Sequence, residues 1–96
     1  MSGRSKKKLD QGNANQYKHA LVIWLDIAGR DDAWMDISDA RGLKPARMIT
    51  SGWILKDVED HIVVASSLDT QEGLAGNVNA IPRCVIQTIQ ITPKIE

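Results

Sequence analysis

The sequence predicts a mainly β protein in which five short strands form one small barrel. Two observations lead to this prediction. Two runs that are dense in β-branched residues, residues 48–55 and 62–65, flank a short polar stretch that suits a hairpin turn of about four residues. Gly52 lies inside the first run, and an interior glycine marks a bulge, a sharp bend or a close backbone approach. A strand that bends halfway is what a small barrel needs to close.

The N-terminal part of the chain differs from the rest. Residues 1–18 are rich in Ser, Gly, Lys, Asn and Gln, so we expect a flexible basic arm ahead of a single domain at 19–96. The first strand is expected at residues 20–28, where alternate residues share a face. Its fully apolar face consists of Leu21, Ile23, Leu25 and Ile27. Its other face is mixed and consists of Val22, Trp24 and Asp26.

The long connection at 29–45 begins with a turn signal and contains a short helix. Asp36 is placed to cap the helix, and Asp39 is acidic near the positive end of its dipole. Gly42 is expected to end the helix in a left-handed conformation.

The remaining elements follow the hairpin. A second loop is expected at residues 68–77, and a short strand follows at 78–81. Pro82 is expected to open a single turn of 3₁₀ helix at 82–84, since proline fits a first helical position. The last strand is expected at 85–91, with Ile89 and Ile91 pointing inward.

This order of elements resembles that of an SH3-like barrel. The ending GNVNAIPRCV, residues 76–85, is similar to the close of SH3 domains, where a glycine-containing strand runs into a proline and a 3₁₀ turn. The paired aromatic motif of the first SH3 strand and the tyrosine of the 3₁₀ turn are missing, and Cys84 stands near that tyrosine's place. The resemblance implies the fold, and it does not imply binding of proline-rich peptides.

A second resemblance covers roughly residues 20–91. The segments LVIWLDIAG, PARMITSGWIL, DHIVVASS and NAIPRCVI look like small uncharacterised proteins encoded in tailed-phage genomes. It implies a viral accessory protein that acts in the host cytoplasm and has no assigned chemistry.

Charge divides the chain into two parts. Residues 1–18 carry five basic residues against one acidic residue, which is 5 − 1 = +4, and the remainder carries 7 − 11 = −4. An acidic body argues against a barrel that grips a phosphate backbone across a broad face. The single cysteine excludes an internal disulfide and fits a reducing cytoplasm, and no apolar run approaches the 18 residues of a membrane span.

No motif of enzyme chemistry is present, so we expect no catalytic residue, no cofactor and no metal. Two acidic clusters are the candidates for a metal site. One is the turn with Asp57, Glu59, Asp60 and His61, and the other is the loop with Asp31, Asp32 and Asp36. We favour a solvated hairpin tip for the first and turn and cap chemistry for the second. Cys84 is expected to be a buried structural thiol rather than a nucleophile.

Three tryptophans carry most of the aromatic area. Trp53 is expected to fill the core, whereas Trp24 lies on the mixed face and Trp34 in the long connection. Tryptophan is enriched at interfaces, so binding and packing are both open for Trp34. The basic residues near the loops, Arg30, Arg41, Lys44, Arg47 and Arg83, are either scattered surface charges or a converging anion site. The candidate site for a ligand or partner comprises Trp34, Arg30, Arg47, Arg83 and Trp24.

The basic arm is the strongest electrostatic feature. Its cations, Arg4, Lys6, Lys7 and Lys8, are candidates to contact nucleic acid or a neighbouring subunit. The sequence favours a non-enzymatic, homo-oligomeric binding module for a host protein or a small anionic ligand. A nucleic-acid-binding protein led by the arm and a component of the virion are the alternatives.

Overall fold

The computed structural model describes residues 16–93, which form one antiparallel five-stranded sheet with the order β4-β3-β2-β1-β5. The elements are β1 (Lys18–Asp26), α2 (Ile37–Arg41), β2 (Ala46–Asp57), β3 (His61–Asp69), β4 (Leu74–Pro82), the 3₁₀ helix η2 (Arg83–Val85) and β5 (Ile86–Ile91). The prediction of a mainly β chain with five strands and one short helix is confirmed. The arm cations Arg4, Lys6, Lys7 and Lys8 lie outside the described residues.

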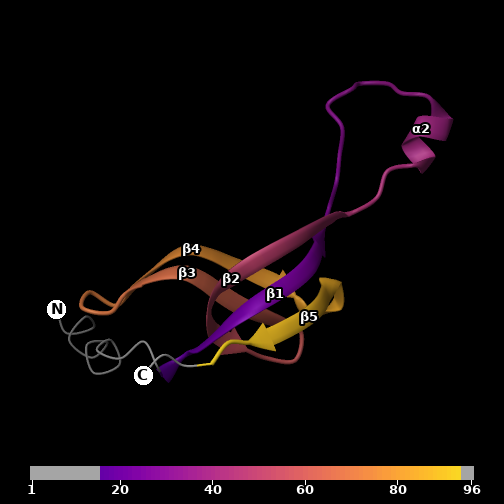
Figure 1. Ribbon diagram of the computed structural model, residues 1–96. Coiled ribbons are helices and arrows are strands. Elements are labelled where there is room, and N and C mark those ends of the chain that lie inside the picture. Colours follow the sequence, from indigo (N-terminus) through magenta and orange to yellow (C-terminus); the bar gives the residue numbers. More distant parts are fainter. Residues whose placement is uncertain (1–15, 94–96) are drawn as a thin grey trace.

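The sheet curls without closing (Figure 1). Antiparallel pairing joins β1 to both β2 and β5, β2 to β3, and β3 to β4. Within residues 16–93 no pairing joins β4 to β5, so these two strands are the edges of the sheet. The prediction that the five strands close into a barrel is therefore wrong, because β4 and β5 do not pair.

Gly52 explains how β3 approaches β2. A Cβ atom at this position would lie 2.3 Å from the backbone oxygen of Ala65, on the neighbouring strand. The register between the two strands then shifts between Ile54 and Lys56, which marks a bulge. Of the three alternatives that the sequence leaves open for Gly52, the close backbone approach is confirmed, and the bulge lies after Ile54.

The core is small and comes from the concave face of the sheet. Its buried side chains are Ala20, Val22, Ile54, Ile62, Val64, Ala65 and Ile81. Trp24, Val85, Ile86 and Ile89 pack against them. The core thus uses the mixed face of β1, and the fully apolar face of β1 is the outer one.

Several local predictions need correction. Asp36 occupies the N-cap of α2 but makes no side-chain capping bond, and Gly42 has a right-handed φ of −84° instead of the expected left-handed one. The second loop is only the turn at 70–73, because β3 and β4 are longer than expected. Cys84 is exposed and is not a buried structural thiol. Ile89 and Ile91 lie opposite the buried Val22 and Ala20, so both point to the inner face as predicted, although Ile91 is 49% exposed at the end of the sheet.

Candidate interaction site

The connection between β1 and β2 is the most unusual part of the structure. Residues 27–45 project from one end of the sheet and carry α2 at their outer end (Figure 1). Every residue of this projecting segment is exposed except Met35, which is half-buried, and α2 buries no side chain. The segment therefore contributes nothing to the core of its own protomer.

Large apolar side chains are nevertheless present along the projecting segment. They are Ile27, Trp34, Ile37 and Leu43, of which Ile27 and Trp34 are each 92% exposed. Of the two interpretations that the sequence leaves open for Trp34, packing within the protomer is not what the structure shows. Large exposed apolar side chains that gather in one region mark contact surfaces.

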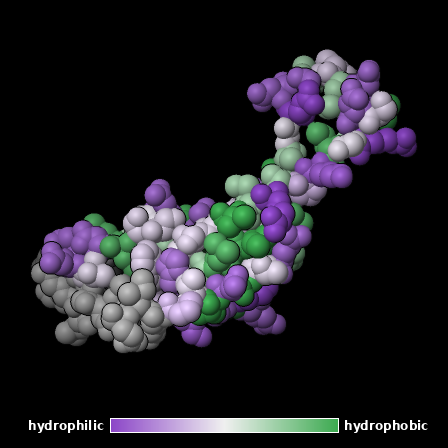
Figure 2. Space-filling view, in the orientation of Figure 1, coloured by the Kyte–Doolittle hydropathy of each residue, from purple (hydrophilic) through white to green (hydrophobic). Residues whose placement is uncertain are grey.

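A strip of apolar side chains continues from the base of the segment onto the sheet. Ile23 of β1 lies opposite Ile49 of β2, so their side chains point to the same outer face. Ile49 is 59% exposed, and Ile23 is half-buried. Figure 2 shows hydrophobic surface gathered on the body near the base of the segment. Arg47 lies opposite Leu25 and adds an exposed cation to this strip.

The outer part of the segment is acidic. Asp31, Asp32, Asp36 and Asp39 all lie within nine positions that include Trp34. Arg30 donates a hydrogen bond to Asp32 at 2.9 Å, and both side chains are about half exposed. Arg30 is the member of the predicted site that lies in the segment besides Trp34, and its guanidinium is paired with Asp32.

Trp24, which was a candidate for partner binding, packs within the protomer. Its indole Nε1 donates a hydrogen bond to the hydroxyl of Thr50 on β2 at 2.9 Å, and its ring packs against the core. Trp53, which we expected in the core, is half-buried and meets His19 edge to face with ring centroids 4.9 Å apart. Neither ring is available to a partner in the way that Trp34 is.

Arg83 holds η2 against the tip of the β2–β3 hairpin. Its guanidinium pairs with the carboxylate of Asp57 and donates a hydrogen bond to the carbonyl of Val58 at 2.7 Å. Its backbone N–H donates to the carbonyl of Asp60 at 2.8 Å. Arg30, Arg47 and Arg83 therefore lie on three different elements, and two of them are paired with carboxylates.

The hairpin tip also contains one perturbed carboxyl. The hydrogen bond between Asp60 and Nδ1 of His61, 2.6 Å long, and the charge of His61 hold the pKa of Asp60 below its ordinary value. Among residues 16–93 no group of three or more His, Cys, Asp and Glu side chains is arranged to hold a metal ion.

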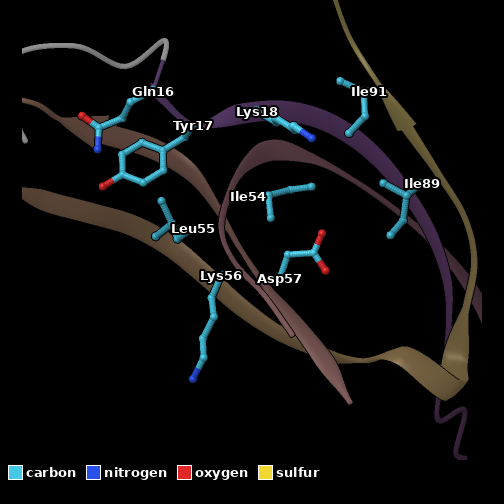
Figure 3. Close-up of a pocket in the computed structure, with 9 residues that line it drawn as sticks. All are labelled: Gln16, Tyr17, Lys18, Ile54, Leu55, Lys56, Asp57, Ile89 and Ile91. Carbon is cyan, nitrogen blue, oxygen red and sulfur yellow. The ribbon is translucent and has the colours of Figure 1, made fainter. Parts of the chain in front are cut away.

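A cavity of about 280 Å³ opens where β1 begins and β2 and β5 end. Its lining residues are Gln16, Tyr17, Lys18, Ile54, Leu55, Lys56, Asp57, Ile89 and Ile91. In Figure 3 the side chains of Ile54, Ile89 and Ile91 face one shared space, and Asp57 also points toward it, whereas Lys56 points away at the rim. No local pattern in the sequence predicts this cavity, because its walls come from strand ends that are far apart in the chain.

Comparison of the chain with protein-family models, curated proteins and solved structures gives no match. In the described part of the chain no helix has the length and apolar character needed to cross a membrane. We therefore describe the protein by its own structure, as an open five-stranded sheet with a projecting segment between β1 and β2.

Proposed function

We propose that this protein is a non-enzymatic binding module with an open, SH3-like curled sheet, which works as a homo-oligomer. The observation that carries the proposal is the exposure of Trp34 and its apolar neighbours on the projecting segment. Burial of an aromatic side chain of this kind removes roughly 150–250 Å² from water. At about 25 cal/mol per Å², one such side chain stabilises a contact by several kcal/mol.

The open sheet supports the same proposal. Strands β4 and β5 are edges, and an edge strand presents unpaired backbone groups that another chain can cover. Self-association is a common way to cover both edges and apolar patches, and most soluble oligomers are made of identical copies. The sequence resemblance to small tailed-phage proteins supports an accessory role in an infected cell, with a host protein as the further partner.

The arginines suggest where a small anionic ligand would bind. Arg47 is exposed on the apolar strip, and Arg30 is about half exposed on the projecting segment, where an anion would compete with Asp32 for its guanidinium. Arginine forks suit carboxylate and phosphate groups. A contact between two copies through this strip would add arginines of both copies to one junction.

Light scattering coupled to size-exclusion chromatography tests the proposal. The full chain is expected to elute at a multiple of its 10.6 kDa mass at concentrations of about 10–100 μM. A single species at the monomer mass throughout this range contradicts the proposal. High salt provides a second measurement, because a contact dominated by apolar area persists when surface charges are screened.

A further inference from the structure

We propose that Trp34 of one copy binds in the cavity between β1, β2 and β5 of the next copy, so that copies join head to tail. This inference rests on the proposed homo-oligomer and names the contact that builds it. Three observations carry it: where the two surfaces lie, what the cavity offers to an indole, and how the charges around them match.

The two surfaces lie at opposite ends of β1. The projecting segment follows Asp26 at the end of the strand, whereas the cavity is formed around Lys18 at its start. At about 3.3 Å per residue, nine residues separate these ends by roughly 26 Å. Because the segment also points away from the body, its Trp34 meets the cavity of another copy rather than its own (Figure 1).

The cavity has the size and chemistry of a site for one large side chain. Its volume of about 280 Å³ is just below the range of about 300–1,000 Å³ that small-molecule pockets occupy. Ile54, Ile89 and Ile91 supply aliphatic walls (Figure 3). Lys18 lines the same space and offers a cation to the face of the indole. The carboxylate of Asp57 points into it and has lone pairs left to accept the indole N–H.

The charges around the two surfaces are complementary. Residues 31–39 around Trp34 contain four aspartates and no basic residue, and Asp31, Asp36 and Asp39 have no ion-pair partner among the residues the structure describes. The cations Arg41 and Lys44 follow further along the segment. Lys18 and Lys56 lie at the cavity, and neither pairs with a carboxylate within residues 16–93. An acidic segment end that approaches a basic rim is steered toward it and fixed in orientation.

The geometry has a consequence for assembly. A contact that joins two different surfaces of the same chain repeats from copy to copy, and it produces a closed ring or an open filament instead of a symmetric dimer. The wild-type particle is therefore expected to exceed the dimer mass of 2 × 10.6 = 21.2 kDa.

Two variants of the full chain test the contact from its two sides. Trp34→Ala removes the inserted side chain, and Ile91→Glu places a charge in the cavity wall. Each is expected to raise the dissociation constant about 30-fold or more and to yield monomers, because a buried tryptophan is typical of an energetic centre of an interface. Leu74→Ala, which truncates an exposed apolar side chain on β4, is the control and is expected to leave the mass unchanged. Circular dichroism melting checks that all three variants fold.

Mixing the two monomeric variants provides the decisive measurement. The Ile91→Glu chain keeps an intact Trp34, and the Trp34→Ala chain keeps an intact cavity. An equimolar mixture is expected to form a 1:1 dimer of 21.2 kDa that grows no further, since its two outer surfaces are both damaged.

The outcomes separate this inference from the proposed function. A monomeric wild-type chain overturns both. A wild-type oligomer that Trp34→Ala leaves intact overturns only the inference, as does one that Ile91→Glu leaves intact, because Trp34 then binds elsewhere. An oligomer that survives Trp34→Ala but dissociates when residues 1–15 are deleted identifies the N-terminal segment as the occupant and also overturns the inference.

Discussion

Replacement of Gly52 by alanine is expected to be among the most damaging single-methyl changes in this protein. The added Cβ would lie 2.3 Å from the oxygen and 2.9 Å from the carbon of the Ala65 carbonyl. Both atoms belong to the backbone of the neighbouring strand, so no side-chain rotation relieves the clash. Overpacking of a core costs about 1–3 kcal/mol, and we expect Gly52→Ala to cost about 3 kcal/mol, since β3 itself must move away from β2.

Urea unfolding followed by tryptophan fluorescence measures this cost. A domain of this size is stable by roughly 5–14 kcal/mol, so the variant is expected to fold and to be measurable. With a slope near 2 kcal/mol per molar urea, the unfolding midpoint is expected to fall by about 1.5 M. The measurement should be made on the Trp34→Ala background if the wild-type chain assembles, because assembly adds its own stability.

Gly76→Ala is the matched control. Gly76 is also a strand glycine, on β4, and its added Cβ would meet only the Cβ of Ser67 at 3.6 Å, which is an ordinary contact. This variant is expected to change stability by less than about 1 kcal/mol, in the stabilising direction if at all. Equal midpoints for Gly52→Ala and wild type would refute the close approach of β3 to β2 and the bend that follows from it.

Three further predictions concern other parts of the molecule. Trp24→Phe loses the hydrogen bond to Thr50 and is expected to cost about 1 kcal/mol in the same urea assay, whereas Thr50→Ser keeps the hydroxyl and should cost less. The hydrogen bond and charge of His61 lower the pKa of Asp60 below 3.8, so this interaction stabilises the fold above that pH and is lost as the pH falls through the lowered pKa. Wild type should therefore lose slightly more stability than Asp60→Asn on acidification below about pH 4, as followed by thermal melting. The nucleic-acid alternative predicts a gel shift at low salt that weakens steeply with added salt and disappears when residues 1–10 are deleted.

Much of the strand pattern is predictable because local preferences and tertiary structure agree there. The hairpin around residues 58–60 follows from β-branched runs on both sides of a polar stretch, and the 3₁₀ turn follows from Pro82. The role of Gly52 is predictable in kind, since a glycine inside a strand usually marks a bulge or a close backbone approach. Its partner Ala65 is not, because the register of two strands depends on the bulge after Ile54.

The faces of β1 show why alternation alone is insufficient. The fully apolar face has the pattern of a core face, yet the buried residues are Ala20 and Val22 of the other one. Trp24 lies on the same concave face as Ala20 and Val22 and packs against the core, so side-chain size does not decide between the faces. The direction in which the sheet curls decides it, and Leu21 and Ile23 remain on the outer side. The prediction for Cys84 is wrong because Val85 is the residue of η2 that packs against the core, whereas Cys84 is exposed.

The candidate site is partly visible in the sequence. Trp34 is a large aromatic residue in a polar, acidic stretch, and that signal is sufficient to select it. The sequence does not single out Ile27, Ile37 and Leu43, because Ile27 fits the apolar face of the expected first strand, and Ile37 and Leu43 fit the short helix and its end. The cavity has no local signal at all, since Lys18, Ile54 and Ile89 come together only when three strands are assembled.

The conformational entropy that is lost when the projecting segment is ordered is not offset by contacts within one copy of the chain. Fixing the backbone of one residue costs about 1–2 kcal/mol, so holding 19 residues in a single conformation costs on the order of 20 kcal/mol. Residues 27–45 bury almost nothing within the protomer that offsets this cost, and their helix has only five residues, well short of the length at which an isolated helix is stable. A partner that buries Trp34, Ile37 and Leu43 supplies part of the missing stabilisation, about 10 kcal/mol. Hydrogen exchange in α2 is therefore expected to be fast in the Trp34→Ala monomer and slower in the wild-type assembly. Equal exchange rates in the two would mean that the segment is ordered by its own sequence, and the main reason for assigning it an interaction role would be lost.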